Sequence, residues 1–371
     1  MGFPQDTEEF RKAFQQRRKC LLDGLDPRKT TGVEIGALCR PMVQRTDGNI
    51  IYVDHVDTEA LKRKYQRDPD VDAARLVNVD AVWGANTLHQ AINGRFVDYV
   101  IASHVVEHVP DVVSWLQELA SILSPTGEVR LAVPDKRFTF DCLRRETSLS
   151  DVLLSYMAKA RIPQPHCLLD FAINAAKIDA KKAWKGITQH AAQRHYSWQE
   201  ALGLAEDSLR NGNYHDVHCW VFTPRSFARL LGDLAQAGLT DLACERFIDT
   251  KRWHAEFFVH LRRSRDRTYV VETWRAMEKA SNMARPGSLS WSLRNVSKRL
   301  RPNGALHPLS RTTGRPSELD PREPLGLPTN FSPNEYLRIH PDVKENGADP
   351  ASHYKLFGWY EGRPYKATPS L

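Results

Sequence analysis

The stretch VDYVIASHVVEHVPDVVSWLQELASILSPTGEVRLAV (residues 97–133) alternates two apolar runs with one helical pattern. The runs at 97–103 and 128–133 are short and rich in β-branched side chains, as is typical of strands buried on both faces. Between them, residues 111–123 place their apolar side chains on one helical face, and Gly127 follows as a turn. A strand, a crossover helix and a second strand predict a parallel sheet covered by helices.

Five further apolar runs extend this sheet along the chain in both directions. They are GVEIG (32–36), NIIYV (49–53), ARLVNV (74–79), LACERFI (242–248) and AEFFVHL (255–261). Helical segments lie between them, including one that opens at Thr223-Pro224 and closes at Gly238. The sequence therefore predicts an α/β fold with a doubly wound, seven-stranded, mostly parallel sheet.

Changes in composition divide the chain into four parts. We expect an N-terminal helix (1–24), a sheet domain (25–263), a basic linker with a helix at 269–280 (264–330), and a small aromatic-rich helical module (331–366). Within the sheet domain, residues 135–213 interrupt the strand–helix rhythm and are rich in His, Arg and Lys. We expect a helical insertion there, over the carboxyl ends of the strands, where such sheets bind ligands.

The composition is that of a folded chain. Among 371 residues, 41% are hydrophobic and 26% are charged, which excludes a mainly disordered protein. No stretch approaches the roughly 18–20 apolar residues of a membrane span, and no signal-peptide pattern is recognisable at the start. Six scattered cysteines without a C-x-x-C pair argue against a zinc ribbon or a disulfide framework and favour a reducing compartment. We expect a cytoplasmic protein.

The net charge of +7 comes from one region of the chain. Basic residues outnumber acidic ones between Arg262 and Arg322, and the rest of the chain is close to neutral. This segment is either a solvated linker or a contact for an anionic surface, such as that of the inner membrane. Nucleic acid is an unlikely partner, because only Tyr269, Trp274 and Trp291 are aromatic within the basic run.

An acidic residue lies at the carboxyl end of each of the first three predicted strands. In GVEIGALCRP (32–41), an acidic residue and a glycine end the first strand and lead into an expected helix, although Leu38 and Arg40 replace the further glycines of a phosphate-binding loop. Asp54 ends the second strand, where a carboxylate can accept both ribose hydroxyls, and Asp80 ends the third. Each acid alone is more often a helix cap, but the ordered set favours an adenosine-containing ligand.

Longer motifs carry a resemblance to a known family. They are VDYVIASHVVEHVPD (97–111), LSPTGEVRLAVPDKRFTFD (123–141), NYHDVHCWVFTPRSF (213–227) and EFFVHLRR (256–263). Together they resemble class I S-adenosylmethionine-dependent methyltransferases with a Rossmann-like fold, and more narrowly the bacterial methyltransferase type 11 branch, over about residues 25 to 262. The chain departs from that pattern at Thr126, which replaces a glycine before the fifth strand, and in its single-glycine first loop.

The resemblance implies methyl transfer from S-adenosylmethionine and a set of binding residues. Carried over by position, the cofactor would contact Glu34, Gly36, Ala37, Asp54, Asp80, Ala81, Ser103 and His104. The acceptor would contact Asp135, Lys136, Arg137 and Asp141, unless these charges pair internally to anchor the insertion.

An oxygen acceptor needs a base, and histidine titrates near neutral pH. His104 is the first candidate, with His215 and His218 next. The alternative is that His104 only hydrogen-bonds the end of its strand.

The segment His104-Val-Val-Glu107-His108 also matches the H-x-x-E-H pattern of inverted zincins. That motif needs a helix, whereas this one follows a buried strand directly, which disfavours a protease. Some ubiquinone-pathway and small-RNA-terminus O-methyltransferases resemble this fold and hold a divalent metal through E-x-x-E-H plus a distant histidine. The counterpart here would be His104, Glu107 and His108 with His215 or His218. Many relatives carry the same "EH" step without metal, so the sequence assigns no metal site and leaves a divalent metal as an alternative.

The tail, residues 330–365, resembles a short module found beside bacterial glycosyltransferases and surface-polysaccharide enzymes. The matching elements are HPDV (340–343), HY (353–354) and G-x-x-E-G-R (358–363). Tyr336, Tyr354, Phe357, Trp359 and Tyr360 would form one aromatic cluster across two short helices. Exposed aromatic faces stack on sugars, which would suit a glycan partner, although a small core is the other use for such rings.

Together these features predict methyl transfer to an oxygen of a sugar, polysaccharide or lipid-linked glycan, in polysaccharide biosynthesis. A glycosyltransferase assembly is a further expected partner. Two alternatives remain: a methyltransferase acting on a small acid or other anionic acceptor, and a non-catalytic glycan-assembly scaffold with a degenerate methyltransferase fold.

Overall fold

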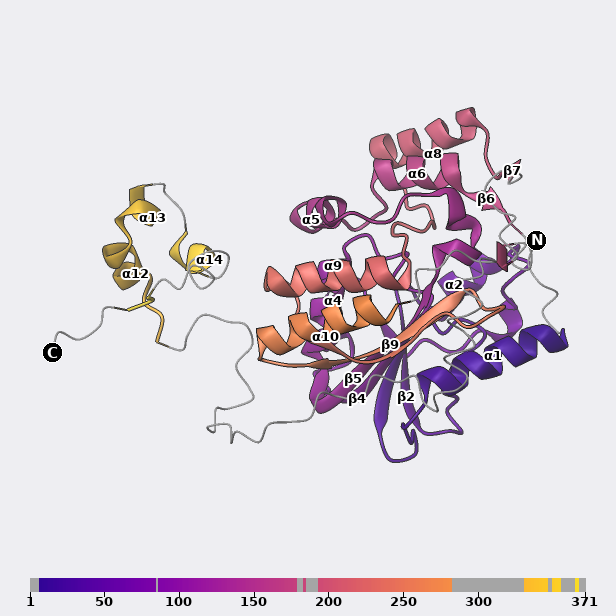
Figure 1. The fold of residues 1–371 in the computed structure, drawn as a ribbon, viewed down its shortest axis with the longest axis horizontal. Coiled ribbons are helices and arrows are strands. Elements are labelled where there is room, and N and C mark those ends of the chain that lie inside the picture. Colours follow the sequence, from indigo (N-terminus) through magenta and orange to yellow (C-terminus); the bar gives the residue numbers. More distant parts are fainter. Residues whose placement is uncertain are drawn as a thin grey trace. The chain divides into compact units, whose positions relative to one another are not determined.

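The predicted seven-stranded sheet is present, in the strand order β3-β2-β1-β4-β5-β9-β8 (Figure 1). Its strands are β1 (Thr31–Ile35), β2 (Asn49–Asp54), β3 (Ala81–Val82), β4 (Val97–Ser103), β5 (Leu123–Pro134), β8 (Leu242–Ile248) and β9 (Glu256–Arg263). The first five pair in parallel, whereas β9 runs antiparallel to both β5 and β8. The fold is therefore a doubly wound, mostly parallel α/β sheet, as the sequence predicts.

The computed structural model describes residues 7–84, 86–178, 183–184, 193–281, 330–345, 349–354 and 364–366. The chain divides into two compact units, residues 1–311 and 312–371. None of the described helices is long and apolar enough to cross a membrane.

Alternate residues of each central strand face two separate layers of the core. On β4, Val100 and Ala102 pack in the layer that contains α4 (Val112–Ser121), α9 (Pro224–Gln236) and α10 (Arg267–Ala280). Tyr99 and Ile101 face the opposite layer, which α1 (Glu8–Leu21) covers together with the loop between β1 and β2. This period of two with apolar residues on both faces is what a sheet covered by helices requires.

The helix expected at 269–280 is present, but it packs on the sheet domain and is not part of a linker. Residues 267–280 form α10, which packs against α9 and β8. Its Val270, Trp274 and Met277 side chains are buried in the main core, and the Trp274 indole donates to the Leu242 carbonyl of β8. The apolar spacing within α10 makes it part of the domain, whereas residues 282–329 lie outside the described part of the chain.

The third strand is not at 74–79, where the sequence predicts it. A two-residue strand, β3 (Ala81–Val82), follows Asp80 instead. Residues 73–75 form a 3-10 turn, η1 (Ala73–Arg75). The N–H of Val77 then donates to Leu38, and that of Val79 to the Thr58 hydroxyl at the start of α2 (Thr58–Tyr65). With these donors used elsewhere, 74–79 does not pair with β2, and only Ala81–Val82 forms β3.

No helix follows β1, contrary to the expectation for residues 36–41. Leu38 has a φ of +47°, which is incompatible with a right-handed helix. The N–H groups of Met42 and Val43 donate to the carboxylate of Glu34 rather than to helical carbonyls. The loop is therefore built on a side chain of β1.

The insertion after β5 is helical, as predicted, where the structure describes it. It contains η2 (Lys136–Phe138), η3 (Phe140–Leu143), α5 (Leu149–Met157), α6 (Pro165–Asn174), β6 (Ala176–Lys177), β7 (Gln193–Arg194) and α8 (Trp198–Asn211). Because it leaves the sheet at the carboxyl end of β5, it lies at the strand ends where ligands bind; Figure 1 shows α5, α6 and α8 together at that end. A short α3 (Leu88–Ala91) precedes β4.

In the described part of the second unit, three short helices surround a small aromatic core. They are α12 (Pro333–Ile339), α13 (Pro341–Glu345) and α14 (Pro350–His353), one more than expected. Tyr336 and Tyr354 pack with Phe331 and Tyr365, and both tyrosines are buried. These two predicted rings therefore form a small core; Phe357, Trp359 and Tyr360 lie outside the described residues.

Candidate active site

The loops after β1 and β4 approach each other at the centre of the sheet, where the strand order reverses. Gly36 follows β1 with a φ of +66°, and a Cβ atom on it would lie 3.1 Å from a Val105 methyl carbon. Its N–H donates to the Val53 carbonyl of β2. Ligands of doubly wound sheets bind outside this reversal point, and a glycine keeps the two loops close there.

His104 follows β4 in a strained conformation. Its φ is +55°, a left-handed value that is uncommon for residues other than glycine. The His104 N–H donates to the Ala132 carbonyl of β5, and its ring Nε2 lies 2.5 Å from the Glu256 carboxylate. The side chain is 32% exposed, so the ring is reachable from outside while its Nε2 is held in place.

Glu256 fixes this ring from the first residue of β9. It is buried, and it pairs in register with Pro134 at the carboxyl end of β5. Arg17 of α1 donates to the same carboxylate at 2.8 Å. Burial alone would raise the pKa of Glu256, but Arg17 and His104 outweigh it and lower the pKa to about 2. The carboxylate is therefore ionised at neutral pH and makes a charge-assisted bond to His104.

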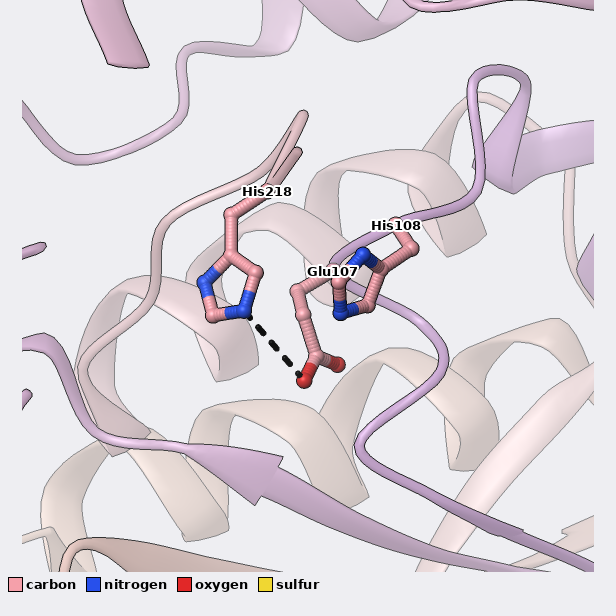
Figure 2. Close-up of side chains that lie close together, drawn as sticks. All are labelled: Glu107, His108 and His218. Atoms are coloured by element: carbon pink, nitrogen blue, oxygen red, sulfur yellow. Dashed lines mark ion pairs between the residues drawn. The ribbon is translucent and has the colours of Figure 1, made fainter. Parts of the chain in front are cut away.

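Glu107, on the turn after β4, is fully buried. Neither of its carboxylate oxygens has a hydrogen-bond partner within the described part of the chain. Oε1 lies 3.5 Å from His104 Nδ1 and 4.0 Å from His218 Nε2. Figure 2 shows the carboxylate between the rings of His108 and His218. We call these four residues, His104, Glu107, His108 and His218, the Glu107 cluster.

Two hydrogen bonds of Trp220 bring His218 to Glu107 from more than a hundred residues away. The Trp220 N–H donates to the Glu107 carbonyl, and the Trp220 indole donates to the Val109 carbonyl. His218 Nδ1 lies 2.6 Å from Asp141 of η3, which leaves Nε2 for Glu107. Burial alone would raise the pKa of Asp141, but His218 and a neighbouring arginine hold it below its ordinary value.

Asp216 lies behind His108 in a similar way. Its Oδ1 is 2.9 Å from His108 Nδ1, out of line for a hydrogen bond, and Lys64 of α2 pairs with its other oxygen. Burial alone would lower the pKa of His108, but Asp216 and Glu107 raise it above its usual value. The rings of His108 and His218 meet edge to face with centroids 4.7 Å apart.

Of the predicted cofactor residues, Asp54 at the end of β2 is buried. Its Oδ1 accepts the N–H of His55 and lies 2.6 Å from the His55 ring. Both contacts use Oδ1, which leaves Oδ2 for a further donor. Ser103, the last residue of β4, has a buried hydroxyl without a hydrogen-bond partner among the described residues. These two side chains have hydrogen-bonding capacity left for a ligand.

Glu34 and Asp80 are engaged by the protein itself. Glu34 accepts the N–H groups of Met42 and Val43 at 2.7 and 3.1 Å, and burial raises its pKa to about 7. Asp80 accepts the Tyr52 N–H and pairs with an arginine of the β1–β2 loop. Their cofactor contacts stay predictions, as do those of Ala37 in that loop and Ala81 at the start of β3.

The predicted acceptor residues are held mainly inside the fold. Arg137 binds the fully buried carboxylate of Asp135 through two nitrogens, and the Thr250 hydroxyl donates to it as well. Lys136 Nζ lies 3.4 Å from the Cys142 carbonyl, and burial lowers its pKa. These contacts and the pairing of Asp141 with His218 agree with the alternative interpretation, in which the charges pair internally to anchor the insertion. Binding of the acceptor by these residues remains a prediction.

His215 lies apart from the pairings of the Glu107 cluster. Its Nε2 is 2.7 Å from Asp207 of α8, although His215 lies only three residues before His218 in the sequence. Of the two histidines that the sequence left open as partners of Glu107, the structure brings His218 to it.

The sequence profile of a family described as "Methyltransferase domain" matches residues 21–243, more than half of the chain. The protein belongs to this methyltransferase family. No curated protein matches its sequence.

Three solved methyltransferase structures are similar to this chain. The N-methyltransferase NodS from Bradyrhizobium japonicum WM9, in complex with S-adenosylhomocysteine, is 17% identical over 35% of this chain and 65% of its own, with a TM-score of 0.26. Magnesium protoporphyrin IX methyltransferase from Synechocystis PCC 6803, also with S-adenosylhomocysteine, is 13% identical over 71% and 90%, with a TM-score of 0.31. CcbJ from Streptomyces caelestis is 10% identical over 71% and 99%, with a TM-score of 0.36. At TM-scores this low, they do not indicate which atom this protein methylates.

Sequence reasoning missed Glu256, Arg17 and Asp216 of this methyltransferase. Glu256 opens the apolar run EFFVHL, and a charge entering a buried strand is a signal that it has a partner. Arg17 is one of several cations on an amphipathic helix, so its role shows only in the fold. Asp216 lies between two histidines in the sequence NYHDVH, but nothing there indicates that it faces His108.

Proposed function

We propose that this protein transfers the methyl group of S-adenosylmethionine to a hydroxyl oxygen, with a sugar or glycan as acceptor. Family membership supports methyl transfer. The observation that carries oxygen as the acceptor atom is His104, a partly exposed imidazole at the end of β4 whose Nε2 is held by an ionised Glu256. Oxygen acceptors must lose a proton, and a carboxylate-backed histidine is suited to take it.

The residues at the strand ends fit an S-adenosylmethionine site. Asp54 offers a carboxylate oxygen at the end of β2, where a ribose hydroxyl would donate. Gly36 leaves room beside β1 that a side chain would fill. Ser103 presents a buried hydroxyl without a partner in the described residues. The cofactor supplies an activated methyl group on its sulfonium, so the protein's task is to bind and align the two reactants.

In this proposal His104 accepts the acceptor's proton at Nδ1, since Nε2 faces Glu256. The acceptor oxygen forms a bond to the methyl carbon as the carbon–sulfur bond breaks, and the bonding electrons go to sulfur. The products are a methyl ether and S-adenosylhomocysteine, and the proton stays on His104 until it passes to water. Glu256 stabilises the resulting imidazolium and holds the ring orientation.

The glycan as acceptor rests on the tail's resemblance to modules beside glycosyltransferases. Association with a glycosyltransferase assembly, and contact of the basic segment with an anionic inner-membrane surface, belong to the same proposal. A small acid is the second candidate acceptor, for which Lys136 near the end of β5 is the available cation. A non-catalytic scaffold is the third possibility and predicts no methyl transfer.

The test is methyl transfer from labelled S-adenosylmethionine to a panel of sugars, sugar nucleotides, lipid-linked glycans and small acids. We expect label in a sugar ether, and about a 100-fold or larger fall in turnover for His104→Gln, with S-adenosylhomocysteine affinity kept within about twofold. His195→Gln, a change to an exposed histidine of the insertion, is the matched control. Label in a carboxylate ester would favour a small-acid acceptor, and undiminished turnover of His104→Gln would remove it as base.

A further inference from the structure

Glu107 is a buried carboxylate that the described part of the chain leaves without a hydrogen bond. An ionised carboxylate taken out of water is costly unless it is paired, hydrogen-bonded or bound to a metal ion. The imidazole nitrogens of His104 and His218 lie 3.5 and 4.0 Å from Oε1, beyond the length of a good hydrogen bond. A small cation between these groups would satisfy what the protein alone does not.

The histidines around Glu107 share an arrangement typical of metal ligands. His218 places one ring nitrogen on Asp141, and His108 places one beside Asp216. A carboxylate that accepts a hydrogen bond from one ring nitrogen, as Asp141 does from His218, fixes the ring and raises the basicity of the other nitrogen, as in carboxylate–histidine–metal sites. One ligand atom each from Glu107, His108 and His218 lie within 4.8 Å of one another, and Figure 2 shows the two rings on either side of the carboxylate.

We propose that Glu107, His108 and His218 bind one divalent transition-metal ion. Two imidazoles and one carboxylate favour zinc, manganese or iron over magnesium, which prefers oxygen ligands. Tetrahedral zinc holds such ligand atoms roughly 3.3–3.5 Å apart, so these side chains would move closer together when the ion binds. His108 is partly exposed, so the cluster reaches the protein surface at this residue.

Three protein ligands leave a fourth position of the ion open, as in catalytic zinc sites. His104 adjoins that position, because its Nδ1 faces Glu107. The ion would bind the acceptor hydroxyl there and lower its pKa, so that His104 takes its proton more readily. This role rests on the proposed function, whereas the binding of the ion does not.

The test is calorimetric titration of the chelator-treated, full-length protein with Zn²⁺, with Mg²⁺ as the comparison ion. We expect one equivalent of Zn²⁺ bound with micromolar or tighter affinity, and binding of Mg²⁺ at least about 100-fold weaker. Glu107→Gln and His218→Gln should each weaken Zn²⁺ binding at least tenfold. His215→Gln should leave it unchanged, because His215 lies in the same loop but faces Asp207.

Two results would overturn the proposal: absence of Zn²⁺ binding by the wild type, or Zn²⁺ binding that Glu107→Gln and His218→Gln leave intact. Thermal unfolding of each variant without metal checks that it is folded, and Glu107→Gln is well suited because it keeps the shape of a buried side chain that has no hydrogen bond from any described residue. Should His218→Gln fail to fold, Glu107→Gln alone decides. S-adenosylhomocysteine binding is titrated in parallel, so loss of the metal site and loss of the methyltransferase function are distinguished.

Discussion

Two buried glutamates at the same edge of the sheet have opposite surroundings. Glu34 on β1 accepts two backbone N–H groups from the loop that follows it. Glu107 after β4 has imidazoles near it but no hydrogen bond from any described residue. The difference separates a carboxylate that builds the fold from one that is available to a ligand.

Glu256 is a third buried carboxylate and sharpens the comparison. Its partners are the side chains of Arg17 and His104, and they lower its pKa to about 2. The backbone partners of Glu34 do not offset its burial, and its pKa rises to about 7. Directly paired charged groups thus keep the Glu256 carboxylate ionised, whereas two backbone donors and the more distant charge of Arg18 do not offset the burial of Glu34.

Removing the loop-holding carboxylate should have the largest effect on stability. Glu34→Ala leaves the buried N–H groups of Met42 and Val43 without acceptors, and we expect it to lower the free energy of unfolding by about 2–4 kcal/mol near pH 6. Glu107→Gln in metal-free protein should change it by less than about 1 kcal/mol, or raise it. Urea unfolding of both variants measures the contrast, and equal losses would contradict it.

Arg17→Met should reduce the stability that Glu256 contributes through its lowered pKa. A folded pKa of about 2, below the unfolded value, means that this stability is present above about pH 4.5 and is lost as the pH falls toward 2. The full contribution is about 3 kcal/mol, and Arg17 supplies the strongest attraction to the carboxylate. Unfolding between about pH 7 and pH 3 should be less pH-dependent in Arg17→Met than in wild type, and an unchanged slope would rule out the pair.

A smaller effect concerns Glu34 and pH in the opposite direction. Because its folded pKa of about 7 exceeds the unfolded value, wild-type stability should fall as the pH rises from about 5 to about 8, by about 2 kcal/mol from this group. Glu34→Ala should abolish that part of the slope. The measurement is the midpoint of urea unfolding across this range, and a slope that survives the substitution would assign it to another group.

The fold followed from the sequence because its signals are local. Apolar runs such as 97–103 and the helical face of 111–123 depend only on neighbouring residues. The predictions of a strand at 74–79 and of a helix after β1 were wrong because groups outside these segments accept their N–H groups. The Thr58 hydroxyl accepts the N–H of Val79, and the Glu34 carboxylate accepts N–H groups of the β1–β2 loop. A pattern in 74–79 cannot reveal such competition.

The site was predictable only in part for the same reason. His104 and Glu107 lie three residues apart in one motif, so the sequence alone identifies both as candidate site residues. Their partners lie far along the chain. Glu256 is 152 residues from His104, and His218 is held near Glu107 by the hydrogen bond from the Trp220 N–H to the Glu107 carbonyl. Whether His218 or His215 lies near Glu107 depends on the conformation of the loop that contains both, which the sequence does not reveal.

The most direct test of the central claim, that the strand ends form a methyltransferase site, is calorimetric titration of the protein with S-adenosylhomocysteine. The account predicts micromolar binding that Asp54→Asn weakens about tenfold or more, since a charge-assisted hydrogen bond from the ribose is lost, while Glu107→Gln leaves it unchanged. Absence of binding by the wild type, or binding that Asp54→Asn does not affect, would contradict the account.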